Sequence, residues 1–182
     1  MESFIIFLLM LVYVFFRVAF GKLKDKTADD RARHRHGLEL VRQKKYSEAI
    51  DYFNKVLQKD TNCALAYAVR GKCLLAQGEL FEAIVDCNRA ASFDHCLAEA
   101  YLDKGIALFR LKQYTESYIE IDKAVWYTRD NAETYRWRGI LRTQLGMHDK
   151  ARQDLEKAVQ LGDEHAGYYL LHKGGNRNLI QQ

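Results

Sequence analysis

The sequence contains no proline among its 182 residues. Proline lacks a backbone donor and breaks helix interiors, so its absence favours a nearly all-helical chain with short turns. The sequence also lacks a strong excess of one charge, because it has 28 Lys and Arg and 24 Asp and Glu, which gives a net charge of only +4. This small excess is spread along the chain and does not indicate a nucleic-acid partner.

Motifs for catalysis and metal binding are absent as well. No Ser-His-Asp, Cys-His or phosphate-loop pattern occurs at a usable spacing. His34 and His36 are two residues apart, so on a helix they point to different faces and form no metal pair. We therefore predict that the chain is not an enzyme and has no metal, no cofactor and no small-molecule substrate.

The cysteines follow no pairing motif. The chain has four, and none belongs to a CxxC pair: Cys63, Cys73, Cys87 and Cys96. We interpret them as reduced thiols in a reducing compartment.

One long apolar run occupies residues 3–20, where Arg17 is the only charged residue. As a helix these residues rise about 27 Å, close to the roughly 30 Å hydrocarbon core of a bilayer. We predict a transmembrane anchor. A cleavable signal peptide needs a positive start and a small-x-small cleavage site, whereas this chain starts with Met1 and Glu2. An apolar helix buried in the fold is the third interpretation.

Basic residues flank only the C-terminal side of this run: Lys22, Lys24, Lys26, Arg31 and Arg33. The positive-inside rule then predicts a single-pass protein with its N-terminus outside and the rest of the chain in the cytosol. Residues 21–29 are expected to form a short polar linker.

Four glycines recur at an interval of 34 residues: Gly37, Gly71, Gly105 and Gly139. Small residues keep the same interval at Ala49, Ala83, Ser117 and Ala151. Such an interval predicts an array of stacked helix pairs.

The expected units are 30–63, 64–97, 98–131 and 132–165, followed by a terminal helix at 166–173 and a flexible tail at 174–182. Apolar periodicity predicts helix pairs at 64–77 and 81–94, 98–111 and 115–128, and 132–145 and 149–162. In the first unit Thr27 is the expected N-cap.

These positions, with runs such as Tyr46-Ser47-Glu48-Ala49-Ile50, resemble the tetratricopeptide repeat family over about residues 30–165. The usual closing proline is replaced by Thr61, His95, Arg129 and Asp163. The seventh position, often Leu in the family, holds His36, Arg70, Lys104 and Arg138. The resemblance implies an all-α, right-handed superhelical array.

The resemblance also implies a concave groove, lined by the first helix of each pair, that binds a peptide or an amphipathic helix. The implied groove residues are Leu65, Val69, Lys72, Leu102, Asp103, Ile106, Phe109, Arg110, Arg136, Trp137 and Ile140. Several are large and apolar, which is typical of an exposed interaction site. The alternative is that some pack against neighbouring helices.

Members of the family that bind Hsp70 or Hsp90 C-termini use a clamp of Lys, Asn, Asn, Lys and Arg. The corresponding positions here are His34, Leu38, Val69, Glu99 and Asp103, and two of them reverse the charge. A C-terminal carboxylate would meet repulsion, which argues against these partners.

We expect a membrane-anchored, non-enzymatic scaffold that binds a protein partner. The alternative is a receptor or assembly factor for protein translocation or membrane-complex biogenesis.

Overall fold

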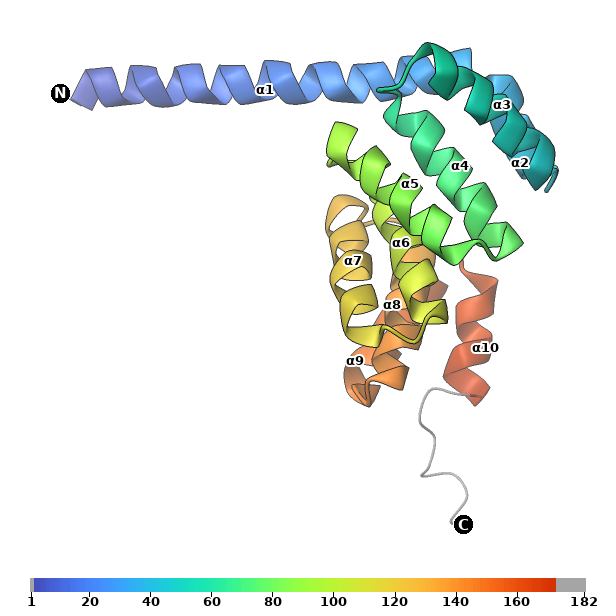
Figure 1. Ribbon diagram of the computed structural model, residues 1–182. Coiled ribbons are helices and arrows are strands. Elements are labelled where there is room, and N and C mark those ends of the chain that lie inside the picture. Colours follow the sequence, from blue (N-terminus) through green and yellow to red (C-terminus); the bar gives the residue numbers. More distant parts are fainter. Residues whose placement is uncertain (1, 173–182) are drawn as a thin grey trace.

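The protein forms an all-α array in the computed structural model, which describes residues 2–172, with side chains at 5–18 and 26–171 (Figure 1). The predicted tail at 174–182 lies outside the described residues. The helices are α1 (Glu2–Arg33), α2 (Arg35–Arg42), α3 (Tyr46–Lys59), α4 (Ala64–Gln77), α5 (Leu80–Phe93), α6 (Ala98–Arg110), α7 (Tyr114–Tyr127), α8 (Ala132–Gln144), α9 (His148–Gln160) and α10 (Glu164–His172).

The helices pack as successive antiparallel pairs. Within a unit α4 packs on α5, α6 on α7 and α8 on α9, and each second helix then packs on the first helix of the next unit. The first helices α4, α6 and α8 also contact one another directly, and α10 closes the array against α8 and α9. The core is therefore continuous along the stack and does not belong to any single unit.

The recurring small residues lie where the two helices of a unit cross. A Cβ atom on Gly105 would lie 2.4 Å from Ile121 Cγ1, and one on Gly37 would lie 2.5 Å from Tyr52 Cδ1. The partner Ser117 is fully buried and its hydroxyl donates to the Gly105 carbonyl at 2.7 Å. The 34-residue interval thus marks positions at which the two helices approach closely and a larger side chain would displace its neighbours.

The turn inside each unit contains one residue in the left-handed backbone region. The φ angles are 59° at Lys44, 92° at Gly78, 62° at Lys112 and 74° at Gly146. These positions are again 34 residues apart. Glycine adopts this conformation without strain, whereas the two lysines adopt it at some cost.

Side-chain oxygens hold the turns between units, where the family usually has proline. The Asp60 carboxylate accepts a hydrogen bond from the backbone N–H of Asn62 at 2.9 Å, and the Asp94 carboxylate accepts one from the backbone N–H of Cys96 at 2.9 Å. Asn131 caps α8 by accepting from the backbone amides of its first turn. These local bonds fix the turns without a proline ring.

The first unit differs from the expectation at its start. Helix α1 extends to Arg33, so Thr27 lies inside a helix and its predicted role as an N-cap is wrong. The Thr27 hydroxyl donates to Asp94 of the next unit at 2.8 Å. The expected linker at 21–29 falls within the bounds of α1, and only His34 separates this helix from α2.

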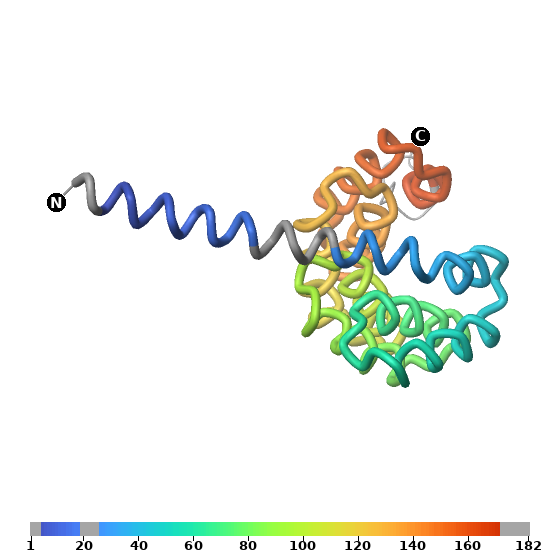
Figure 2. The backbone as a smooth tube through the Cα atoms, turned by 90° about the horizontal axis from the view of Figure 1, so that it is seen from above, coloured from blue at the N-terminus to red at the C-terminus, as the bar shows by residue number. Residues whose placement is uncertain are grey.

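The apolar part of α1 points away from the array, as the blue segment in Figure 2 shows. Its side chains are strongly exposed, from 45% at Val14 to 70% at Phe15. Within the residues that the structure describes, no helix is both apolar enough and long enough to cross a bilayer. The membrane-spanning helix expected at residues 3–20 is therefore not supported.

Candidate protein-binding groove

The expected groove residues lie on the first helices α4, α6 and α8, which run side by side along the array. Six of them are largely buried: Leu65 (1% exposed), Val69 (6%), Leu102 (5%), Asp103 (5%), Ile106 (5%) and Ile140 (7%). The expectation that Leu102, Ile106 and Ile140 form a free apolar surface is wrong. Because consecutive first helices touch, their facing side chains close over one another and become core.

An aromatic hollow remains open where α6, α8 and α10 meet. It has a volume of about 340 Å³ and is lined by Phe109, Tyr114, Trp137, Ile140, Thr143, Gln144 and Tyr169. The rings of Phe109 and Trp137 meet edge-on, with centroids 5.8 Å apart. The structure thus brings together Phe109, Trp137 and Ile140 from the expected groove.

Four lining residues of the aromatic hollow were not among the expected groove residues. Tyr114 comes from the second helix α7, and Thr143 and Gln144 come from the last turn of α8. Tyr169 on α10 continues a series of tyrosines at the 34-residue interval, Tyr67, Tyr101 and Tyr135, and this register is the one sequence signal that pointed to it.

A charged cluster lies further along the same face, around Asp103. Burial raises the pKa of the Asp103 carboxyl to about 7; the nearby Lys72 ammonium opposes this rise, whereas Glu133 and Glu99 add to it. The Asp103 charge is in turn the main reason why the pKa of Lys72 is raised. Three carboxyl groups from α6 and α8 therefore surround one lysine of α4.

Most other charges of this face are paired. Arg31 of α1 donates to both carboxylate oxygens of Glu99, at 2.9 and 2.8 Å. Arg136 bonds Asp163 at 2.7 Å and Glu133 at 3.3 Å. Arg110 donates to the Leu75 carbonyl at 2.8 Å. The end of α1 thus reaches across to α6, and Asp103 is left with long-range partners.

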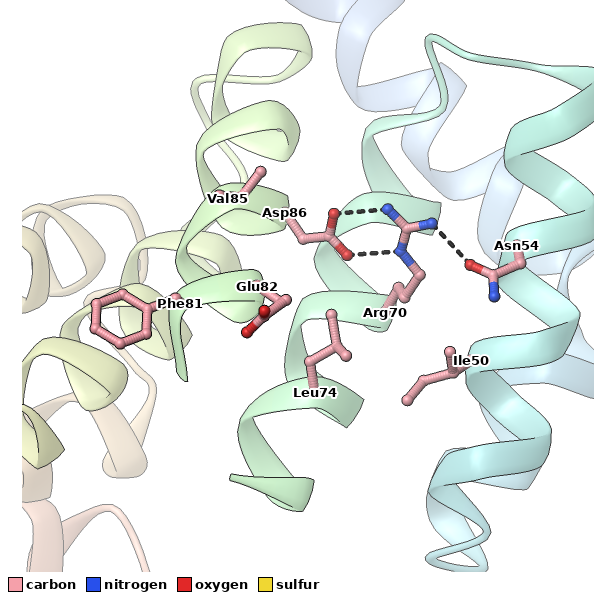
Figure 3. Close-up of a pocket in the computed structure, with 8 residues that line it drawn as sticks. All are labelled: Ile50, Asn54, Arg70, Leu74, Phe81, Glu82, Val85 and Asp86. Atoms are coloured by element: carbon pink, nitrogen blue, oxygen red, sulfur yellow. Dashed lines mark hydrogen bonds and ion pairs between the residues drawn. The ribbon is translucent and has the colours of Figure 1, made fainter. Parts of the chain in front are cut away.

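A second hollow opens between α3, α4 and α5, with a volume of about 470 Å³ (Figure 3). Arg70 crosses its floor, with Nε and Nη2 donating to Asp86 at 2.6 and 2.7 Å and Nη1 donating to Asn54 at 2.8 Å. Phe81 and Val85 on its rim are 68% and 57% exposed. Since all three nitrogens of Arg70 are engaged, we assign this cation a structural role.

The same pairing recurs at the seventh position of each later unit. Lys104 bonds Glu120 at 3.1 Å, and Arg138 bonds Asp154 at 2.8 Å. Arg138 also reaches back to Asp122 on the preceding second helix, at 2.6 Å. The cations that replace the usual leucine therefore tie the two helices of a unit together.

Family models described as tetratricopeptide repeat match residues 34–94 and 132–162. The units are tetratricopeptide repeats. No curated protein sequence matches the chain at a significant level.

Solved structures show the same tetratricopeptide fold. A crystal structure of MamA is 25% identical, with a TM-score of 0.61 over 69% of this chain and 74% of its own. The first repeat domain of Spaghetti (RPAP3), solved with the HSP90 peptide SRMEEVD, is 25% identical, with a TM-score of 0.58 over 62% and 90%. The protein TTC0263 from Thermus thermophilus is 19% identical, with a TM-score of 0.65 over 71% and 72%.

The five clamp positions of this tetratricopeptide array offer little to a carboxylate. Val69 and Asp103 are buried, and Glu99 is an acid bound to Arg31. Leu38 packs against the buried core of the first unit, around Leu40 and Phe53. The Nδ1 atom of His34 lies 3.2 Å from the Tyr52 hydroxyl oxygen. Free cations for a C-terminal carboxylate are missing at these described positions.

Proposed function

We propose that this tetratricopeptide array is a non-enzymatic scaffold that binds a protein partner, either a peptide or an amphipathic helix, along its first helices. The aromatic hollow carries the proposal, because rings from α6, α7, α8 and α10 converge there around an open volume. Aromatic side chains in a concave site are the usual anchors of protein recognition. An apolar side chain of the partner would enter the aromatic hollow.

The charged cluster suggests the chemistry of the flanking residues of the partner. Glu99 and Glu133 are already paired with Arg31 and Arg136, so Asp103 is the carboxyl group of this cluster that a cationic side chain of the partner could approach. The HSP90 peptide solved with Spaghetti ends in Glu-Glu-Val-Asp and carries the opposite charge. We therefore expect acidic Hsp70 and Hsp90 tails to bind weakly here.

A photo-crosslinking side chain at Gln144 tests the groove. Gln144 lines the aromatic hollow and ends α8, whereas Gln160 ends α9 on an exposed surface and is the matched control. We expect one protein to be captured at Gln144 in native membranes and none at Gln160. The captured protein, once purified, should bind Gln144→Trp at least tenfold more weakly than the wild type or Gln160→Trp. Equal binding by all three proteins contradicts the groove.

We further propose that residues 3–20 anchor the scaffold in a membrane as a single pass, with the N-terminus outside and the array in the cytosol. The exposed apolar side chains from Ile5 to Val18 support attachment, since monomeric soluble proteins rarely expose such a continuous apolar surface. The alternative function, a receptor or assembly factor for translocation or membrane-complex biogenesis, uses the same anchor. In that case the groove captures an amphipathic helix of a client.

Alkaline carbonate tests the anchor. We expect it to leave the full chain in the membrane and to release a shortened chain that starts at Thr27. Extraction of both proteins rules out a spanning segment. Protease added to sealed vesicles of known orientation then reports on which side the array lies.

A further inference from the structure

Three possible metal ligands meet at the junction between α1, α2 and α4. Asp30 of α1, His34 between α1 and α2, and Cys63 just before α4 each offer one ligand atom, and these atoms lie within 4.8 Å of one another. Asp30 and Cys63 are 3% and 0% exposed, and His34 is partly buried. The cluster therefore brings oxygen, nitrogen and sulfur together in a nearly dry place.

The spacing of the cluster fits a tetrahedral ion. The Cys63 Sγ and Asp30 Oδ2 atoms are 3.7 Å apart. Around Zn²⁺, bond lengths of about 2.0–2.3 Å separate two tetrahedral ligands by about 3.3–3.6 Å. The Cys63 and Asp30 atoms are thus already close to the separation of two zinc ligands, and the His34 nitrogen, which lies within 4.8 Å of both, would complete the set by moving inward.

The Asp30 carboxylate has a weak set of partners for a buried charge. Its Oδ1 atom accepts from Arg33 at 3.2 Å, but the Arg33 side chain is 59% exposed. Its Oδ2 atom faces the Cys63 thiol, which is a poor donor. A buried carboxylate normally requires a strong partner, and a bound cation supplies one.

The surroundings of the cluster suit a resident ion. Tyr52 places its hydroxyl 3.2 Å from His34 Nδ1 and packs edge-on against the imidazole ring, as an orienting outer residue does. A hollow of about 170 Å³ borders Asp30 and is also lined by Lys26, Thr27, Asn62, Ala64, Phe93 and Asp94. It provides an entry path and room for a water molecule.

We propose that Asp30, His34 and Cys63 form a zinc-binding site that ties the end of α1 to the start of α4. Mixed thiolate, imidazole and carboxylate ligands are typical of Zn²⁺. A water molecule would complete the tetrahedron. The site is independent of partner binding and of the membrane anchor, and its effect would be to stabilise the first unit against α1.

Half of this signal is visible in the sequence. Asp30 and His34 are four residues apart and share a helix face, whereas the pair considered from the sequence, His34 and His36, does not. Cys63 comes close only through packing, since it is 33 residues away from Asp30.

Cobalt titration of the full chain in detergent tests the site. Co²⁺ substitutes for Zn²⁺ and reports a thiolate ligand through a charge-transfer band in the near ultraviolet. We expect one equivalent to bind with this band and with the strong visible bands of tetrahedral cobalt, and Zn²⁺ to displace it. Cys63→Ser should abolish the charge-transfer band. His34→Gln should weaken binding by more than the roughly 10- to 100-fold loss typical of an outer-shell change.

Matched controls distinguish this site from accidental binding. Cys96→Ser removes an exposed thiol next to His95, and His36→Gln removes a neighbouring imidazole outside the cluster. Both should keep the full signal, and circular dichroism should show unchanged helicity in every variant. If the band survives Cys63→Ser, disappears in Cys96→Ser, or never forms in the wild type, the proposal is overturned. If Cys63→Ser misfolds, the Co²⁺ affinities of His34→Gln and Asp30→Asn test the site instead. If both variants bind Co²⁺ as tightly as the wild type, the proposal is overturned.

Discussion

Lys44 and Lys112 occupy turn positions at which the other two units have glycine. A left-handed conformation costs a non-glycine residue about 1–2 kcal/mol, because Cβ approaches the following carbonyl oxygen. Part of this cost returns through the greater freedom of glycine in the unfolded chain. We predict that Lys112→Gly raises the free energy of unfolding by about 0.5–1 kcal/mol.

Urea unfolding measures this change as a shift of the midpoint with an unchanged slope. The reverse substitution Gly78→Lys should lower the free energy of unfolding by a similar amount, because φ is 92° at that turn. A loss of stability in Lys112→Gly would show that the lysine side chain contributes more than its backbone strain costs.

Asp103 predicts a pH dependence of stability. Its pKa is raised from 3.8 to about 7, so between these values the folded protein holds a proton that the unfolded chain has lost. The contribution of Asp103 to stability therefore falls as pH rises from about 4 to about 7, and it stays constant above. Asp103→Asn lacks this titration. We expect its melting temperature relative to the wild type to rise over this pH range and then to level off.

Melting curves at pH 5, 6, 7 and 8 provide the measurement, since subtracting the wild type removes groups that titrate in both proteins. A difference that does not change with pH would mean that Asp103 stays ionised throughout. Lys72 does not confuse the result, because its pKa is raised above 10.5 and lies outside this range.

At the scale of helices, the Arg70–Asp86 pair ties α4 to α5. The Asp86 side chain is 5% exposed and that of Arg70 is 23% exposed. Removing one member of a buried pair leaves a charge without a partner, which costs about 3–5 kcal/mol, whereas removing both is often neutral. We predict that Arg70→Met destabilises the protein by about 3 kcal/mol, and that Arg70→Met with Asp86→Leu recovers most of the loss.

Chemical unfolding of the two single variants and the double variant gives the coupling energy directly. The exposed pair Arg152–Glu156 is the control, and Arg152→Met should change stability by no more than about 0.5 kcal/mol. If the double variant is as unstable as Arg70→Met, the pair contributes through its packing and not through its charges.

The arrangement of the helices could be predicted because it depends on local periodicity. The positions of Gly37 and Gly105 set the helix crossings, and the apolar spacing then located α4 at residues 64–77. The second helices α5, α7 and α9 begin one residue earlier than expected, since Glu79, Gln113 and Met147 accept the first helical hydrogen bonds. The N-cap expected at Thr27 is wrong, because this residue lies inside α1.

The groove could be predicted only in part. Helical periodicity alone predicts which face of α6 carries Leu102 and Ile106, and this face lies against the neighbouring first helices. Whether that face stays open depends on how closely α4, α6 and α8 approach one another, and no pattern within one helix contains that distance. The aromatic hollow likewise depends on α10, which adds Tyr169 to the lining that includes Trp137.

In the part of the chain that the structure describes, a stacked array carries an exposed apolar helix end. The side chains of Ile5 to Val18 remain largely exposed, and α1 contacts the array through its C-terminal part, where it packs on α2 and α4 and where Arg31 bonds Glu99 of α6. In such an array stability comes from contacts between neighbouring units. We predict that deleting residues 1–25 leaves the melting temperature within about 2 °C of the full chain.

Calorimetry of both proteins in the same detergent measures this difference. The shortened protein keeps Arg31 and its bond to Glu99, so the junction with α6 stays intact. A large drop in melting temperature would mean that the deleted residues are part of the cooperative unit.

The raised pKa of Asp103 also has a consequence for binding. Near neutral pH this buried group is partly protonated, and a cation that arrives beside it would lower its pKa and expel the proton. Association with a basic segment would then release up to one proton into the buffer. By linkage, the partner would bind more tightly as the pH rises. The proton on Asp103 and the cation of the partner thus compete for the same place in the groove.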